Sequence, residues 1–279
     1  MKESKSWVEK QRDVEAFLRS EKVEIPEVMV VLGSSLGSTI DSYEKKRVIP
    51  FGQIPHLHRA AAKTHAGNLV FTEVAGRGVV FQQGRLHVYE GYDVRETTLL
   101  VNTLGKMGCK ILVSTDLAGG ITGREEDVVL VTDHIYFAGD NPIIGLEESF
   151  DDKQFVNMVG AYSERLVTLA ESVAREEGVS QVRKGVFAYL TGPSFETRQE
   201  LKVLKSWGAD VVSWSMVPEV MVGVYRGMEV LALSCVSDVS DPDGLAPVDL
   251  VSLYKHGGRA AKKVEKLIAG MLRRRDLCL

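Results

Sequence analysis

Short apolar runs alternate with longer amphipathic stretches along the whole chain. An apolar run of about four to eight residues is typical of a buried strand, and apolar residues three or four positions apart are typical of a helix. The pattern predicts strands over 28–32, 68–74, 78–82, 110–115, 128–131, 185–190, 210–214 and 229–235. It predicts helices over 4–19, 95–107, 161–177, 196–207, 218–226 and 249–272. Buried strands separated by helices indicate an α/β fold whose central sheet is covered on both faces.

No Pro/Ser-rich linker and no internal repeat interrupts this alternation. We therefore predict a single domain that spans residues 1–279. In open α/β sheets the ligand site lies beyond the carboxyl ends of the strands. The residues that follow each predicted strand are therefore the candidates for a functional site.

Composition narrows the class of protein. The 279 residues include 34 Lys and Arg against 38 Asp and Glu, a formal net charge of −4, and 44% are hydrophobic. The apolar fraction is too high for a disordered chain, and the acidic balance argues against nucleic acid as a partner. An anionic substrate would need local basic groups in such a chain.

Cysteine usage and the chain ends bear on the compartment. Cys109, Cys235 and Cys278 have no paired spacing, which argues against disulfides and fits a reducing compartment. No stretch approaches the ~18 apolar residues of a membrane span. The N-terminus lacks the apolar core of a signal peptide, and Cys278 is not placed for prenylation. We expect a cytoplasmic protein with no membrane partner.

Small residues follow the first predicted strand, in the segment Gly33-Ser34-Ser35-Leu36-Gly37. Backbone N–H groups and the Ser34 hydroxyl could bind an anion there. A tight turn explains the segment equally well. The pattern is neither a dinucleotide fingerprint nor a Walker loop, so it does not support either cofactor.

A second candidate segment follows the predicted hairpin. Arg85, His87 and Tyr89 alternate with apolar residues, and in an extended segment this spacing puts all three on one face. A guanidinium, an imidazole and a phenol together suit a phosphate beside a sugar. An ordinary exposed strand face is the alternative. We favour the phosphate site, because the Arg and the His fall inside a Gly-flanked segment, and it would supply the local basic pocket that an anionic substrate needs.

Two further strand ends carry candidate groups. Asp116-Leu117-Ala118-Gly119-Gly120 could present backbone donors after the strand at 110–115. After the strand at 185–190, Ser194 could cap the next helix, while Phe195 could stack on a heterocycle and Glu196 accept its N–H groups. A simple capped helix start explains this last segment as well. No metal-ligand spacing occurs among the six histidines, so we predict no metal.

Several longer motifs occur in a fixed order. They are GSSLG (33–37), THAG (64–67), QGRLHVYEGY (83–92), LAGG (117–120), GPSFET (192–197), GAD (208–210) and MVPEV (216–220). Together they resemble the trimeric purine nucleoside phosphorylases over nearly the whole chain. The resemblance implies a single-domain α/β fold around a mixed sheet, and a homotrimer with sites near the subunit interfaces.

The resemblance also implies roles for individual residues. The phosphate site falls on Ser34, His65, Arg85, His87, the backbone of Leu117, and Ser215. The ribose side falls on Tyr89 and Trp214, with Phe155 reaching the site of the neighbouring subunit. The base falls on Phe195, Glu196, Val212 and Asp238. His87, Glu196 and Asp238 are the groups expected to act in catalysis.

The family's chemistry suits these groups. Phosphorolysis breaks the bond between base and ribose while positive charge develops on the sugar, and bound phosphate attacks it. No protein nucleophile is needed, because the site holds the phosphate and stabilises the leaving base. Orthophosphate is then the co-substrate, the nucleoside is the other partner, and no cofactor is implied.

The sequence departs from the family at the base. Asp238 stands where the family usually has Asn, and an ionised Asp can only accept hydrogen bonds. It would repel a 6-oxo group and suit a 6-amino group, which hints at adenosine-type substrates. Glu196 suits the N1–H of 6-oxopurines instead. The two acids leave the base open, including another amino-bearing base such as cytosine.

Other departures lie along the cavity wall. Trp214 replaces a usual Met, Ser213 a usual Gly, and Asp116 and Leu117 the usual Asn and Ala, so we expect a reshaped or narrowed pocket. The family's histidine near the 5′-hydroxyl aligns with an apolar stretch at 248–250. Its loss could favour a 5′-modified nucleoside or merely weaken binding. The alternatives to a purine nucleoside phosphorylase are therefore a methylthioadenosine phosphorylase and a non-catalytic nucleoside-binding paralogue.

Overall fold

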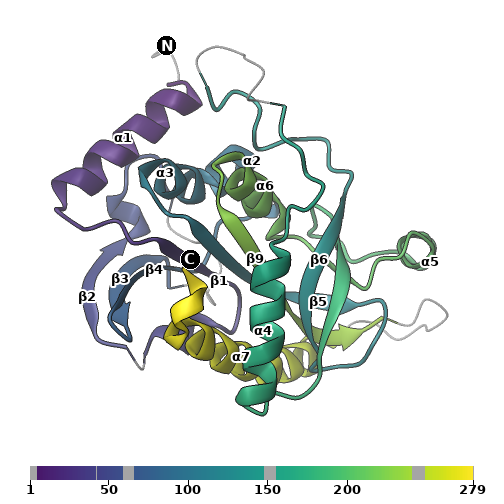
Figure 1. Ribbon diagram of the computed structural model, residues 1–279. Coiled ribbons are helices and arrows are strands. Elements are labelled where there is room, and N and C mark those ends of the chain that lie inside the picture. The colour runs from purple at the N-terminus through teal and green to yellow at the C-terminus, as the bar shows by residue number, and fades with distance from the viewer. Residues whose placement is uncertain (1–4, 42, 59–65, 148–154, 241–248, 279) are drawn as a thin grey trace.

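The computed structural model describes residues 5–41, 43–58, 66–147, 155–240 and 249–278. Within these ranges nine strands join one mixed sheet (Figure 1). In chain order they are β1 (Val28–Leu32), β2 (Lys45–Pro50), β3 (Asn68–Val74), β4 (Arg77–Gln83), β5 (Ile111–Gly120), β6 (Val128–Tyr136), β7 (Val182–Tyr189), β8 (Val211–Ser213) and β9 (Glu229–Val239). The expected mixed α/β architecture is confirmed.

The strand order brings distant segments together. It runs β2-β3-β4-β1-β5-β8-β7-β6-β9, and a further pairing of β5 with β9 closes the last five strands into a ring. β5 runs parallel to β1 and β9 and antiparallel to β8. The ends of β1, β4, β5, β8 and β9 therefore lie close together, and the candidate residues stand at these ends.

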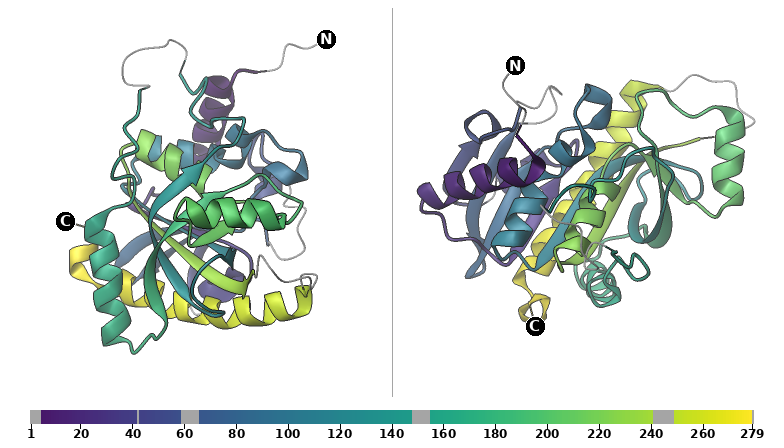
Figure 2. Two further views of the ribbon diagram at one scale, coloured as in Figure 1. Left: turned by 90° about the vertical axis from the view of Figure 1, so that its right-hand side faces the viewer. Right: turned by 90° about the horizontal axis from the view of Figure 1, so that it is seen from above.

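Helices cover both faces of the sheet. Those in the described part of the chain are α1 (Trp7–Ser20), α2 (Val94–Thr97), α3 (Leu99–Met107), α4 (Glu164–Glu176), α5 (Arg198–Ser206), α6 (Val217–Tyr225) and α7 (Leu250–Arg273). Short 3₁₀ helices occupy Gly37–Ile40, Phe51–Gln53, Val88–Glu90 and Arg275–Leu277. Figure 1 shows α1, α2, α3 and α6 on one side and α4 and α7 on the other. In Figure 1 and in the right-hand view of Figure 2, α5 lies at the edge of the molecule.

Each face of the sheet has its own apolar core. One core packs α1, α3 and α6 on the sheet through residues such as Val14, Leu104 and Val220. The other packs α4 and α7 through residues such as Leu166 and Leu267. Burial of these side chains stabilises the fold by roughly 1.5–3 kcal/mol each, and it leaves the strand ends as the place for polar groups.

Long-range pairing lengthens the strands beyond their apolar runs. The prediction that β5 ends at residue 115 is wrong, because Gly119 and Gly120 pair with β8 and β9. Asp116 and Leu117 therefore lie within a strand and not in a loop after it. The basic strand β2 was not predicted, because its exposed Lys45, Lys46 and Arg47 carry no apolar alternation.

Two helix predictions need correction. The stretch 95–107 forms two helices, because the hydroxyl of Thr98 bonds back to the carbonyls of Val94 and Arg95 at the break. Ser194 does not cap α5. That helix begins at Arg198, and Thr197 and Glu200 form its capping box. Glu196 therefore lies in the loop before the helix.

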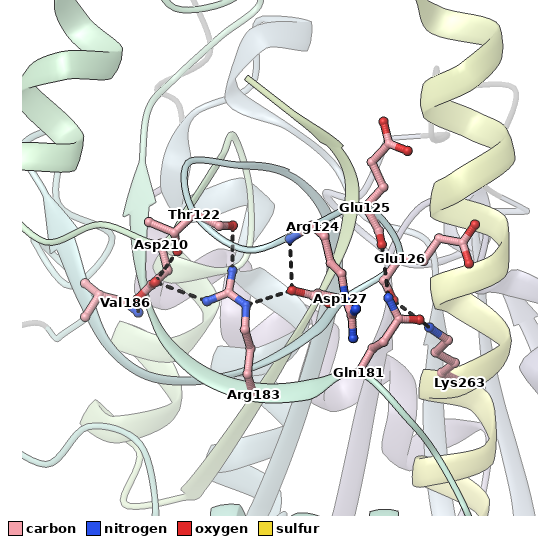
Figure 3. Close-up of polar contacts among 10 residues, drawn as sticks. All are labelled: Thr122, Arg124, Glu125, Glu126, Asp127, Gln181, Arg183, Val186, Asp210 and Lys263. Atoms are coloured by element: carbon pink, nitrogen blue, oxygen red, sulfur yellow. Dashed lines mark hydrogen bonds and ion pairs between the residues drawn. The ribbon is translucent and has the colours of Figure 1, made fainter. Parts of the chain in front are cut away.

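A polar network ties the start of β7 to neighbouring loops (Figure 3). Arg183 donates to the Asp127 carboxylate, to the Asp210 carboxylate and to the Thr122 carbonyl. Asp210 also accepts from the backbone N–H of Val186. Asp210 is the acid of the GAD motif, so this motif stabilises the connections at the starts of β7 and β8.

Candidate active site

A cavity of about 290 Å³ lies at the meeting point of these strand ends. The predicted residues that line it are Ser34, Arg85, His87, Tyr89, Leu117, Phe195, Glu196, Val212, Trp214, Ser215 and Asp238. Segments more than 200 residues apart in the sequence, such as Ser34 and Asp238, thus share one pocket. Its two ends differ in chemistry and are described in turn.

The loop after β1 has features of both predictions for GSSLG, a tight turn and a lining of the candidate site. A Cβ on Gly33 would lie 2.6 Å from the Thr115 carbonyl oxygen, so the backbone of β5 leaves no room for a side chain there. The Gly33 N–H donates to the Thr115 hydroxyl at 3.0 Å. This contact holds the loop against β5, and the next residue, Ser34, lines the cavity.

Arg85 is fully buried and saturated with partners. Its Nε and Nη2 donate to the two carboxylate oxygens of Glu219 at 3.0 and 2.9 Å. The remaining N–H groups reach the Ser114 hydroxyl, the Thr115 carbonyl and the Ser215 hydroxyl. All five guanidinium donors are engaged. Only the Ser215 contact, 3.2 Å long, is not fully buried, so a bound anion would compete for this donor.

His87 is also paired with an acid. Its Nδ1 lies 2.7 Å from the Glu90 carboxylate, and its ring stacks on Tyr89 with centroids 4.5 Å apart. Burial lowers the pKa of His87 against the opposing effect of Glu90, so the ring is largely neutral at pH 7. The expected basic pocket is therefore wrong in one respect: Arg85 and His87 line the cavity, but a carboxylate sits beside each.

Asp116 adds a third carboxylate at this end. It is 1% exposed, and its two oxygens accept from the Ser234 hydroxyl at 2.7 Å and the Ser215 hydroxyl at 3.3 Å. Burial raises the pKa of Asp116 to about 6, although Arg85 and the hydroxyls act against the rise. Asp116 thus changes charge near neutral pH.

Leu117, one of the larger residues in the cavity wall, packs against a neighbouring helix. A Cβ on Gly257 of α7 would lie 2.2 Å from Cδ2 of Leu117, which shows that the leucine side chain packs onto the helix at that glycine. The leucine also packs against the core beneath α4 and α7. The strand therefore keeps its backbone at the cavity, and Gly257 accommodates the extra volume.

Trp214 occupies the middle of the cavity between the two ends. Its ring meets Phe195 at 5.1 Å and Tyr89 edge-on at 5.8 Å between centroids. A Cβ on Gly192 would lie 2.6 Å from the indole, so a side chain there would clash with the ring. Gly192 also has φ +63°, a backbone conformation that favours glycine. The indole N–H donates to Glu196 at 3.4 Å. Trp214 thus orients the acid predicted to bind the base.

Two acids mark the other end of the cavity. Burial raises the pKa of Glu196, and Asp238 raises it further. Burial likewise raises the pKa of Asp238, although the Ser237 hydroxyl, 2.8 Å away, acts against it. Because Asp238 raises the pKa of Glu196, the two carboxyls lie close enough to interact. The base end is therefore acidic, and burial raises the pKa of both acids above their ordinary values.

The start of α7 completes the wall. Leu250, Leu253 and Tyr254 line the cavity beside Ser237 and Ser240. Leu250 is in the stretch that aligns with the family's 5′-histidine, so this wall is apolar as expected. The one-turn spacing of Leu250 and Tyr254 could have indicated a shared helix face.

Among the predicted site residues that the structure describes, Phe155 is the one that does not line the cavity. His65 lies outside the described residues. Phe155 is 74% exposed and lines a separate hollow with Ile144 and Met158. Its role toward a neighbouring subunit stays a prediction.

Sequence reasoning assigned no role to Glu219, although MVPEV was among the motifs. A lone acid in the apolar helix VPEVMVGVY is a usable signal, because a buried carboxylate needs a cation partner.

Among the described residues, no group of three or more His, Cys, Asp or Glu is placed to hold a metal ion. No helix in the described ranges is long and apolar enough to cross a membrane.

Known proteins share this fold and chain length. The phosphorylase superfamily model matches residues 27–273, which defines the class of protein. Purine nucleoside phosphorylase 1 of Bacillus subtilis is 37% identical over 227 residues, covering 81% of this chain and 83% of its own. The chain therefore belongs to the purine nucleoside phosphorylase family, a group of pentosyltransferases.

Solved structures agree with this assignment. A Schistosoma purine nucleoside phosphorylase bound to hypoxanthine superposes with a TM-score of 0.88 at 30% identity, covering 98% of this chain and 99% of that one. Isoform 2 from Schistosoma mansoni, bound to cytosine and ribose-1-phosphate, superposes with a TM-score of 0.87 at 31% identity, covering 96% of each chain.

Proposed function

We propose that this cavity performs phosphorolysis of nucleosides, releasing a free base and (deoxy)ribose 1-phosphate. The observation that carries the proposal is the polarity of the pocket. Hydroxyls, His87 and the paired Arg85 lie at one end, two carboxyls at the other, and aromatic rings between them. Phosphate matches the end with the hydroxyls, the base matches the end with the two carboxyls, and the sugar matches the aromatic middle.

Phosphate would bind at Ser34, Ser215, His87 and the backbone of Leu117, with His65 as a further predicted contact. Arg85 supplies the positive end of this site and would exchange its contact with Ser215 for one with the anion. Phosphate held beside the sugar is itself the nucleophile, so the protein contributes position and electrostatic stabilisation. Tyr89 and Trp214 would hold the ribose against it.

The base would stack on Phe195, pack against Val212 and meet Glu196 and Asp238 at its polar edge. As the glycosidic bond breaks, the leaving base gains electrons and needs a proton or hydrogen bond. The raised pKa of Glu196 supports a role as hydrogen-bond or proton donor to the leaving base, while Asp238 would accept from an exocyclic amino group. The Trp214 N–H would keep Glu196 in place for this step.

Asp238 supports a preference for bases with an exocyclic amino group. A carboxylate accepts a hydrogen bond from such a group, and it would repel a 6-oxo group. The two related structures bind hypoxanthine and cytosine respectively, one base of each kind. We rank adenosine-type substrates first, with cytidine as the other amino-bearing candidate and inosine as the alternative that Glu196 favours.

A 5′-methylthio nucleoside is the second candidate substrate. Leu250 and Leu253 line the cavity near the stretch where the family carries its 5′-histidine. An apolar wall suits a methylthio group better than a hydroxyl. This observation favours a methylthioadenosine phosphorylase as the alternative activity.

The setting of the enzyme follows from the same resemblance. We propose one phosphorylase domain over residues 1–279, a homotrimer, a cytoplasmic location and a role in purine salvage. No cofactor is proposed, and orthophosphate is the co-substrate. The exposure of Phe155 and of its neighbour Ile144 supports a subunit contact on that face.

The test is base release from a panel of nucleosides. The protein is incubated with adenosine, 5′-methylthioadenosine, inosine, guanosine and cytidine, with and without phosphate or arsenate, and the free base is measured. We expect release that depends on the oxyanion and is fastest for an amino-bearing base. Ser215→Ala should raise the KM for phosphate, whereas Ser38→Ala, a hydroxyl bonded to Glu265 outside the cavity, should not.

Binding without turnover of any nucleoside would identify a non-catalytic paralogue and contradict the proposed enzyme. Base release that is independent of phosphate would contradict phosphorolysis itself. Preference for 5′-methylthioadenosine over adenosine would select the alternative activity.

A further inference from the structure

The hydroxyl of Ser215 stands between the predicted phosphate position and the buried carboxyl of Asp116. Ser215 accepts from Arg85 Nη1 at 3.2 Å and donates to Asp116 Oδ2 at 3.3 Å. A serine hydroxyl has one proton to donate. While that proton is used for Asp116, Ser215 has none to offer an oxyanion.

Protonation of Asp116 would change this balance. A neutral carboxyl can donate to the Ser215 oxygen, which still has a lone pair available beside the Arg85 contact. The hydroxyl proton of Ser215 is then released and can point into the cavity. An asparagine at 116 could also donate from its amide nitrogen, without any change of charge.

Charge leads to the same conclusion. Glu219 already balances Arg85, and burial keeps His87 largely neutral. An ionised Asp116 therefore adds a negative charge next to the position that phosphate would occupy. Bringing an anion to this position favours the neutral carboxyl, because like charges in a buried site repel strongly.

We infer that phosphate binds to this chain together with one proton, which Asp116 takes up so that Ser215 can donate to the phosphate. Asp116 is thereby a positioning residue that acts through Ser215. The inference rests on the proposed function, since it assumes that phosphate binds beside Ser215. It makes phosphate affinity decline as pH rises, beyond what the ionisation of phosphate itself causes.

The groups packed around Asp116 are compatible with this role. Arg85 lowers its pKa, and Glu219 on α6 holds Arg85 in place. Burial keeps the pKa values of Cys235 on β9 and Tyr162 before α4 far above neutral, so both remain uncharged. In the described part of the chain His87, whose pKa is lowered by burial, is a further titratable group at the phosphate end. The pKa of Asp116, raised to about 6, leaves the free carboxyl mostly ionised at pH 7 and ready to take up a proton.

Calorimetry of inorganic phosphate binding measures this proton directly. Binding enthalpies in two buffers of different ionisation enthalpy give the protons taken up. Near pH 7 we expect the wild type to take up close to one proton more than Asp116→Asn, and the difference should vanish near pH 5. Protons exchanged by His87 and by phosphate occur in both proteins and cancel in this difference.

Affinity provides a second readout, and Ser234→Ala a second variant. Above about pH 6, the phosphate Kd of the wild type should weaken relative to Asp116→Asn by up to about tenfold per pH unit. Ser234 bonds Asp116 on the side away from Ser215 and does not line the cavity. Its loss removes a hydrogen bond to the ionised carboxyl, so the proton-uptake curve should move to higher pH.

If phosphate binds with equal proton uptake in wild type and Asp116→Asn, the role of Asp116 is overturned while the proposed function stands. A proton-uptake curve in Ser234→Ala that is unchanged from wild type also overturns the role of Asp116. This second variant provides the test if Asp116→Asn fails to fold. Absence of phosphate binding in all three proteins overturns the proposed function and this inference with it.

Discussion

Glu196 and Asp238 show how single side chains set the chemistry of the base end. Both are partly buried beside each other, and burial raises the pKa of each. Both were predicted from the sequence as base contacts. The hydrogen bond from Trp214 to Glu196 was not predicted, because it joins two loops whose separation the sequence does not encode locally.

Asp238→Asn should move substrate preference toward 6-oxopurines. The amide can donate to a 6-oxo group, which the carboxylate cannot. We expect the ratio of kcat/KM for inosine to that for adenosine to rise roughly 10–100-fold, the worth of one mismatched charged hydrogen bond. Asp116→Asn makes the same chemical change at the phosphate end and should leave the ratio unaltered. An unchanged ratio in Asp238→Asn would show that this residue does not read the base.

Asp116 should also make the stability of the fold depend on pH. Its pKa is raised to about 6 by burial, so its contribution to folding is fully present below its ordinary range and is lost as the pH rises through about 6. Relative to wild type, Asp116→Asn should gain up to about 3 kcal/mol of unfolding free energy between about pH 4 and pH 8. Urea unfolding at a series of pH values measures the difference. A constant difference across this range would contradict the raised pKa.

At the scale of elements, α7 and β5 meet at a matched pair of residues. Gly257 allows the helix to approach Leu117, and the start of the same helix lines the cavity. The helix was predicted almost to the residue from its amphipathic pattern. Its contact with β5 was not, since a glycine inside a helix does not reveal which side chain lies over it.

Gly257→Ala should destabilise the wild type and not a chain that also carries Leu117→Ala. The added Cβ would meet Leu117 Cδ2 at 2.2 Å, so the leucine must move. We expect a loss of about 1–3 kcal/mol from overpacking, against a gain of up to about 1 kcal/mol in helix propensity. In the Leu117→Ala background only the gain remains. Urea unfolding of the four proteins gives the coupling energy, and additive effects would exclude the contact.

At the scale of the molecule, exposed apolar side chains line a hollow apart from the cavity. Phe155 and Ile144 are among them, at 74% and 64% exposure. Such a patch is unusual on a chain that stays monomeric. It fits the homotrimer that the family resemblance implies, in which Phe155 completes the site of a neighbour.

Phe155→Ala should therefore impair ribose binding across the subunit contact. We expect the KM for the nucleoside to rise about tenfold, as for loss of one buried aromatic contact, with little change in the KM for phosphate. Phe137→Ala is the matched control, because Phe137 is 77% exposed but packs on Trp207 of its own chain. Light scattering would report whether either variant changes the oligomeric state. A monomeric wild type would contradict the subunit contact altogether.

Most of the elements, the α/β class and most residues of the cavity could be predicted from the chain alone, because apolar periodicity and short motifs are local properties. The partners of those residues could not, because they come together only in the folded chain. Arg85 meets Glu219 across 134 positions, and Ser215 meets Asp116 across 99. These contacts depend on the order and register of β4, β5, β8 and β9. They turn an expected basic pocket into one in which carboxylates balance the cations, because buried charges are stable only when they are paired or neutralised by a proton.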